Sequence, residues 1–147
     1  MKKSLLSLAV ALPLIFTDMA MAAPKSYELA FTSEGYRENH VVYQNVWAPW
    51  IKEIEKRSEG RLKIVFYSPG SVCSSKEVPD AVVKGRVDIG HTLFGANPGR
   101  YGYSDTGDAN ISAISSLAAS MGFHNYIQQN EWVRKELDNE KTKLLAV

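Results

Sequence analysis

Two stretches of the 147-residue sequence carry the side-chain types that bind a small carboxylate. Hydroxyl and amide groups donate hydrogen bonds to carboxylate oxygens, an arginine pairs with them in a bidentate geometry, and aromatic rings provide apolar walls. One stretch runs from Ser33 to Arg37 and the other from Thr92 to Arg100. The candidate ligand-binding residues are Ser33, Tyr36, Arg37, Thr92, Phe94, Asn97 and Arg100.

Each candidate also has a purely structural interpretation. Arg37 and Arg100 are compatible with solvated loop arginines, and Asn97 before Pro98 is compatible with a turn. Two tryptophans, Trp47 and Trp50, share a helical face with isoleucine, so we expect them in the core and not in a stacking platform.

Other chemistries have no local signature in this sequence. His40, His91 and His124 lie far apart without metal-ligand spacing, so we expect no metal site. The single cysteine, Cys73, cannot form an internal disulfide, and a small apolar filler is its favoured interpretation. Asp88 falls in a predicted strand, where we expect a structural hydrogen bond and not catalysis. No phosphate-binding loop or paired-carboxylate motif is present, and we expect no cofactor.

The N-terminus has the three parts of a secretory signal peptide. Lys2 and Lys3 precede an apolar run over 5–16, and the small residues Ala20 and Ala22 follow it. The run is about 12 residues long, shorter than the roughly 20 that a membrane-spanning helix needs. The pattern predicts cleavage after Ala22 and export of the chain.

Charge and length limit the binding partners and the number of domains that we expect for the mature chain. Removing Lys2, Lys3 and Asp18 leaves 15 basic and 15 acidic side chains from the 17 and 16 of the whole sequence. A near-neutral chain gives no electrostatic case for nucleic acid, so we expect none as a partner. About 125 residues are enough for one domain with a sizeable core.

The elements that would position the candidate residues alternate between strands and helices. We expect strands over 27–32, 61–67 and 86–92. Two helices lie between them: one ends at Gly60 in a left-handed cap, and the other opens at a Ser74–Glu77 capping box and ends at Gly85. This order favours an α/β fold with parallel strands. The loops after the three strands, over 33–37, 68–73 and 92–100, should then meet at the carboxyl edge of the sheet.

The rest of the sequence predicts a loop, two helices and a final strand. The loop covers 95–108, and apolar spacing from Ile111 to Met121 predicts a helix that ends at Gly122. A second helix is expected over 125–140, with Tyr126, Val133 and Leu137 on one face and Trp132 pointing away from it. The segment KTKLLAV at the end resembles a strand.

Three segments together resemble the solute-binding proteins of tripartite ATP-independent periplasmic (TRAP) transporters. They are WIKEIEKRSEGRLKIVFYSPGSV, KEVPDAVVKGRVDIGHT and FGANPGRYGYSD, and the resemblance covers about residues 27–104. It implies an α/β fold, the N-terminal lobe of a two-lobe, type II-like periplasmic-binding-protein fold. The family's carboxylate-binding arginine would lie downstream of LLAV, so the resemblance implies a truncated chain, with a signal peptide over 1–22 and an incomplete lobe over 23–147.

The function implied by this resemblance is capture of a small solute, an organic acid, in the periplasm and its delivery to the membrane subunits of a TRAP permease. Two lobes would close around the ligand, and no bond would be made or broken. One alternative is the ligand-binding module of a sensor system. Another is a secreted enzyme that uses Cys73 as its nucleophile.

Overall fold

The structure, a computed structural model, describes residues 25–105, 115–138 and 141–145. The predicted signal peptide over 1–22 lies outside these residues, as does the first part of the helix predicted from Ile111. In the part of the chain that is described, no helix has both the length and the apolar character needed to cross a membrane.

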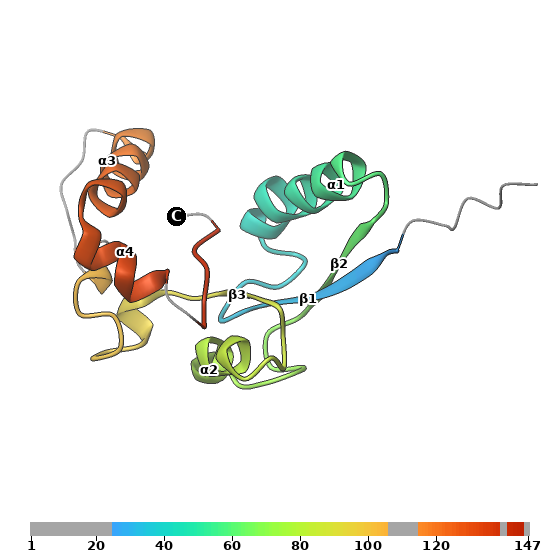
Figure 1. The fold of residues 1–147 in the computed structure, drawn as a ribbon, viewed down its shortest axis with the longest axis horizontal. Helices are drawn as coiled ribbons and strands as arrows, with labels where there is room; N and C mark the ends of the chain where they lie inside the picture. The colour runs from blue at the N-terminus through green and yellow to red at the C-terminus, as the bar shows by residue number, and fades with distance from the viewer. Residues whose placement is uncertain (1–24, 106–114, 139–140, 146–147) are drawn as a thin grey trace, which may run out of the picture.

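A parallel sheet of three strands lies at the centre of the fold (Figure 1). The strands are β1 (Tyr27–Ser33), β2 (Leu62–Tyr67) and β3 (Ile89–His91), in the order β2-β1-β3. Thr32 of β1 lies opposite Tyr67 of β2 and Gly90 of β3, so all three strands end at the same edge. The predicted alternation of parallel strands with helices is confirmed.

Strand β3 is shorter than the segment 86–92 predicted from the sequence. The carboxylate of Asp88 accepts a hydrogen bond from the backbone N–H of Ala30 (2.8 Å), and the N–H of Asp88 donates to the carbonyl of Ala30 (2.9 Å). A side-chain oxygen thus takes the place of a ladder carbonyl, and regular pairing begins one residue later. The structural role expected for Asp88 is confirmed.

Helix α1 (Ala48–Arg57) covers one face of the sheet and follows a π-helical turn over Tyr43–Trp47. Pro49 falls in the first turn of α1, directly after the π-helical turn. Gly60 has a φ of 75°, and its N–H donates to the carbonyl of Glu55 (2.9 Å). The predicted left-handed cap is therefore confirmed.

The core beneath α1 is aromatic and aliphatic. Phe31 of β1 is buried, and its ring centroid lies 5.1 Å from that of Trp47 and 6.1 Å from that of Trp50. Ile51 and Ile64 complete the buried cluster. The two tryptophans therefore pack in the core, as predicted.

Helix α2 (Val78–Val83) covers the opposite face of the sheet. The capping box between Ser74 and Glu77 is present, although it opens a short 3-10 turn that leads into α2. Gly85 follows the helix with a φ of 67°. Cys73 is buried beside α2 in an apolar cluster, as expected of a small packing residue; the cluster comprises Cys73, Val78, Ala81 and Val87.

The boundary between the last two helices differs from the prediction. Helix α3 (Ser116–Gln129) runs through Gly122, and the chain breaks at Asn130 before α4 (Glu131–Leu137). Gly122 has no positive φ and lies inside the helix, so the predicted helix end at this residue is wrong. Asn130 leaves the helical conformation, and its side-chain amide donates to the carbonyl of Tyr126 (2.7 Å).

The strand predicted for KTKLLAV is also wrong for its described residues, 141–145, which form no strand. Thr142 donates its hydroxyl to the carbonyl of Leu137 (3.0 Å), and Leu144 packs against the α3–α4 cluster. These contacts fold the segment back on α4.

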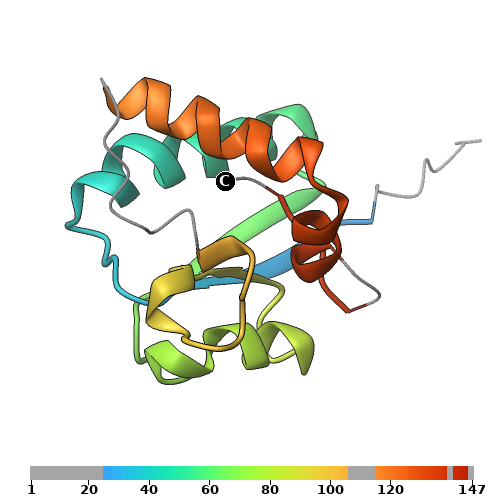
Figure 2. The same ribbon diagram turned by 90° about the vertical axis from the view of Figure 1, so that its left-hand side faces the viewer.

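Helices α3 and α4 lie beyond the carboxyl edge of the sheet and pack on the loop that follows β3 (Figures 1 and 2). Ile127, Val133 and Leu137 form the buried centre of this third cluster. Phe94 and Tyr101, from the segment that follows β3, pack against it. Trp132 points outward, as predicted, and is 68% exposed.

Candidate functional site

The three loops that follow the strands meet at the carboxyl edge of the sheet. Ser68, after β2, donates its hydroxyl to the carboxylate of Glu38, in the segment after β1. Glu34, directly after β1, accepts hydrogen bonds from the loop that follows β3. This confirms the predicted convergence, and two carboxylates hold the loops together.

Thr92 and Asn97 lie side by side at this edge, but both donate to Glu34. The Thr92 hydroxyl is 2.5 Å from Oε1 of Glu34, and the Asn97 amide nitrogen is 2.6 Å from the same oxygen. Asn97 also donates to the carbonyl of Leu93 (3.0 Å). These two candidate donors are therefore used within the chain.

Ser33 has no solvent exposure and organises the turn after β1. Its hydroxyl oxygen accepts the backbone N–H groups of Gly35 (3.3 Å) and Tyr36 (3.1 Å), and lies 3.3 Å from Nδ1 of His91. Because three partners surround this buried hydroxyl, it stabilises the conformation of the turn.

Tyr36 forms an aromatic wall at the same edge. Its ring stacks on His40 at a centroid distance of 4.4 Å, with His91 at 5.2 Å and Trp47 at 5.6 Å. The fold thus brings together two histidines that are far apart in the sequence. They contact the tyrosine through ring faces, and the described residues contain no group of side chains suited to a metal ion.

The two candidate arginines have different environments. Arg100 donates to Asp80 at the start of α2 (2.7 Å), and its guanidinium lies 5.7 Å from the ring centroid of Tyr101. The hydrogen bond and positive charge of Arg100 lower the pKa of Asp80. Arg37 is exposed in the loop after β1 and belongs to no ion pair of the described residues.

Phe94 points into the α3–α4 cluster and away from the loops after β1 and β2. Its ring lies 5.2 Å from that of Tyr101 and 6.1 Å from that of Phe123. It therefore anchors the loop after β3 on the helical layer. Of the seven candidates, Tyr36 packs its ring against His40, His91 and Trp47, and the exposed Arg37 belongs to no ion pair of the described residues.

Sequence reasoning missed Glu34 and Glu38, although they tie the loops together. Glu38 keeps a lowered pKa because Ser68 donates to its carboxylate and backbone bonding reinforces this effect. An acidic residue directly after a buried strand, as in Ser33-Glu34-Gly35, is a signal for such a role. Its partners lie 58 to 63 residues away, which local patterns cannot identify.

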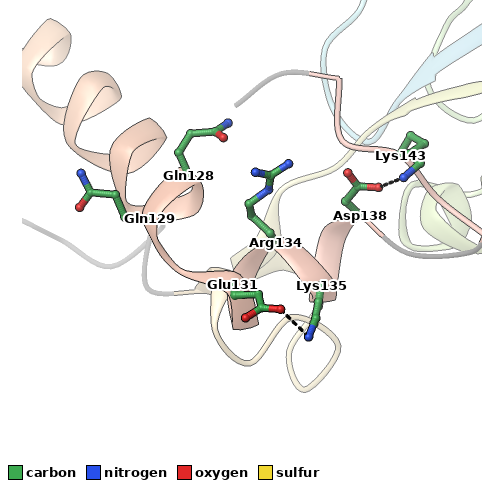
Figure 3. Close-up of a pocket in the computed structure, with 7 residues that line it drawn as sticks. All are labelled: Gln128, Gln129, Glu131, Arg134, Lys135, Asp138 and Lys143. Carbon is green, nitrogen blue, oxygen red and sulfur yellow. Dashed lines mark hydrogen bonds and ion pairs between the residues drawn. The ribbon is translucent and has the colours of Figure 1, made fainter.

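A separate groove of about 360 Å³ lies between α3, α4 and the segment 141–145 (Figure 3). Its lysines are paired within the chain: Lys135 contacts Glu131 at 2.7 Å, and Lys143 contacts Asp138. The lining is polar and includes no residue of the three converging loops. The carboxyl edge, and not this groove, matches the site expected from the topology.

Residues 32–100 match the family model described as bacterial extracellular solute-binding protein, family 7. Over this range, just under half of the chain, the sequence is similar to family 7. The matched segment runs from the end of β1 to Arg100, so it includes the three loops at the carboxyl edge. Among curated proteins, none matches the chain.

Solved TRAP solute-binding proteins share the fold of this chain. A marine metagenome protein specific for aromatic acid ligands, with bound 3-hydroxybenzoate, is 23% identical, with a TM-score of 0.67 over 83% of this chain and 37% of its own. A Bordetella bronchiseptica protein with bound (R)- and (S)-mandelate is 24% identical, with a TM-score of 0.67 over 82% and 37%.

A third solved protein, from Rhodoferax ferrireducens, contains copurified benzoate and is 23% identical, with a TM-score of 0.62 over 73% of this chain and 33% of its own. The chain therefore spans about a third of the length of these proteins. The α/β fold is that of the N-terminal lobe of a TRAP solute-binding protein, as the sequence resemblance implied.

Proposed function

We propose that this chain supplies one lobe of a periplasmic solute-binding protein. The protein captures a small organic acid and delivers it to the membrane subunits of a TRAP permease. The observation that carries the proposal is the family 7 match over the three loops that meet at the carboxyl edge. In an open α/β sheet, ligands bind beyond this edge. The protein acts by binding, and no bond of the solute is broken.

The proposed contacts at this lobe are centred on Tyr36 and Arg37. The guanidinium of Arg37 has no ion-pair partner among the described residues and can form two parallel hydrogen bonds with a carboxylate. The ring of Tyr36 provides an apolar surface beside it, supported by stacking on His40. Ser33, Thr92, Phe94, Asn97 and Arg100 then act mainly by holding the loops in place.

The solute class follows from chemistry at this edge and from the three solved relatives. Their ligands, 3-hydroxybenzoate, mandelate and benzoate, each combine a carboxylate with an aromatic ring. An arginine beside a tyrosine ring complements both parts of such a molecule. We therefore propose a monocarboxylic aromatic acid as the first solute to test.

Export and lobe closure complete the proposed function. Residues 1–22 act as a signal peptide that directs the chain to the periplasm, where residues 23–147 form the solute-binding lobe. A second lobe would close over the carboxyl edge and remove the ligand from water. The aligned relatives are more than twice as long as the chain, which supports a two-lobe protein.

The test is ligand-dependent thermal stabilisation of the purified full chain. We expect benzoate, 3-hydroxybenzoate or mandelate to raise Tm, because a ligand at 100 times its Kd stabilises a protein by about 2.7 kcal/mol. Arg37→Ala should abolish the shift. Arg57→Ala, at the end of α1 beside the opposite edge of the sheet, is the matched control and should retain it.

Two results would contradict the proposal. One is the absence of stabilisation by all three acids in a chain that unfolds cooperatively. The other is an equal loss of the shift in the Arg37 and Arg57 variants, because the effect would then depend on net charge and not on the carboxyl edge.

A further inference from the structure

Glu34 is an acidic residue buried at the carboxyl edge of the sheet. It directly follows β1 and is 6% exposed. Its backbone N–H donates to the carbonyl of His91 at the end of β3 (3.1 Å), which fixes the main chain at this position. The backbone of Glu34 is therefore held in place between β1 and the loop after β3.

The carboxylate of Glu34 lies in a ring of three donors from that loop. Oε2 accepts the backbone N–H of Leu93 (2.8 Å), while Oε1 accepts the hydroxyl of Thr92 (2.5 Å) and the amide of Asn97 (2.6 Å). Asn97 and Thr92 are also 3.1 Å apart, so the donors are held relative to one another. Both carboxylate oxygens are thus satisfied, by one backbone amide, one hydroxyl and one carboxamide. Such a set of donors is typical of a carboxylate-binding site.

No cation shares this position. None of the ion pairs in the described part of the chain includes Glu34, and the nearby arginine, Arg100, is paired with Asp80. Burial is the main reason for the raised pKa of Tyr101, and the charge of Glu34 adds to it. The negative charge of Glu34 is therefore stabilised by neutral donors.

We propose that the loop after β3 contains a built carboxylate site whose permanent occupant is the side chain of Glu34, and that Glu34 is thereby the positioning residue of the ligand-binding edge. This role rests on the proposed function of that edge. It explains why the donors Thr92 and Asn97 are committed within the chain. The carboxylate of a solute is then directed to the free guanidinium of Arg37 and away from the loop after β3.

The test is chemical rescue of Glu34→Ala in the full chain. This substitution removes a CH₂–COO⁻ group, which has the size and charge of acetate, and leaves its three donors in place. We expect Glu34→Ala to lower Tm, and acetate to restore much of the loss with a saturable dose dependence. Sodium chloride at equal ionic strength and acetamide, a neutral analogue of the same shape, should restore little.

Glu38→Ala is the matched control for the rescue. Glu38 also links two loops, but it is exposed, and among the described residues one side chain, Ser68, donates a hydrogen bond to it. Its variant should show no specific response to acetate. An equal response of the two variants, or equal rescue of Glu34→Ala by acetate and acetamide, would overturn the proposal.

A second variant covers the case in which Glu34→Ala does not fold. Glu34→Gln keeps the shape but replaces one acceptor oxygen by an NH₂ group, so one of the three donors faces another donor. We expect the NMR signal of the Leu93 amide to shift and its hydrogen exchange to accelerate. An unchanged Leu93 amide in a folded Glu34→Gln protein would show that the carboxylate does not position this loop.

The acetate rescue experiment and the test of the proposed function have independent outcomes. Acetate rescue of Tm requires no solute, so it can succeed even if benzoate does not bind the wild-type chain. If benzoate binds the wild type, the positioning role further predicts that acetate restores benzoate binding to Glu34→Ala. Restored Tm without restored benzoate binding would contradict the positioning role and leave the proposed function intact.

Discussion

The close packing of β3 against α2 makes Gly90→Ala a sharp test of the fold beneath the carboxyl edge. A Cβ at Gly90 would lie 2.7 Å from Cγ2 of Val82 and 2.9 Å from Cγ1 of Val78. Carbon atoms in proteins normally pack at about 3.5–4.0 Å. Two methyl groups of α2 would therefore have to move by about 1 Å.

Such a movement is costly because both neighbours are stiff. Val78 is 1% exposed, and β-branched side chains in a helix have one strongly preferred rotamer. Overpacking of this kind costs about 1–3 kcal/mol. We therefore expect Gly90→Ala to lower the free energy of unfolding by about 2 kcal/mol.

Gly122→Ala is the matched control. Gly122 lies inside α3, and a Cβ there would meet nothing within 4 Å. Alanine has the higher helix propensity, so this substitution should raise the free energy of unfolding by about 0.5–1 kcal/mol. The same chemical change should thus have opposite signs at the two positions.

The assay is urea unfolding of each purified variant, followed by tryptophan fluorescence and far-UV circular dichroism. Adding Val82→Ala to Gly90→Ala removes one of the two clashing methyl groups and should offset part of the overlap cost. Equal free energies for Gly90→Ala and the wild type, or a destabilising Gly122→Ala, would refute the packing argument.

Three other substitutions test the remaining layers. Trp47→Ala, in the aromatic core, should cost about 3–5 kcal/mol in urea unfolding. Asn130→Ala removes the hydrogen bond to Tyr126 at the α3–α4 junction and should cost about 1 kcal/mol, without shifting the amide signals of the sheet. Pairing with Arg100 lowers the pKa of Asp80, so its stabilisation is present above the unfolded-state pKa and disappears as the pH falls below about 4. In acid titrations of Tm, Asp80→Asn should flatten this part of the curve, and an unchanged curve would contradict the pairing.

The sequence predicted the first half of the fold because its signals are local. The apolar strands, the glycine caps at Gly60 and Gly85, and the capping box at Ser74 each depend on residues within one turn or strand. Because the three strands are parallel, the loops that follow them must meet at the carboxyl edge of the sheet. The prediction needed no knowledge of distant contacts.

The errors occur where a distant contact or a competing local signal determines the conformation. Asp88 shortens β3 because its carboxylate bonds to Ala30, 58 residues away. Gly122 was expected to end a helix, but α3 continues to the stronger stop at Asn130, with Ile127 buried near its end. A glycine permits a cap without requiring one.

The candidate site illustrates the same limit at the level of single donors. Residue types and topology placed Thr92 and Asn97 at the carboxyl edge of the sheet. In the structure, however, both donate to Glu34, and Arg100 donates to Asp80. Each pairing joins residues at least 20 positions apart. Which donors remain free for a ligand is therefore a property of tertiary packing.

These internal pairings also set the charge that a ligand would encounter. The loops after the strands contain two arginines, and Asp80 neutralises one of them while Glu34 is satisfied by neutral donors. The exposed guanidinium of Arg37 is left as the uncommitted cation of these loops. Under the proposed function, Arg37 pairs with one carboxylate of the solute, while the carboxylates of Glu34 and Glu38 keep two negative charges in the same loops. This lobe would therefore repel a second anionic group, so the proposal favours monocarboxylic over dicarboxylic acids.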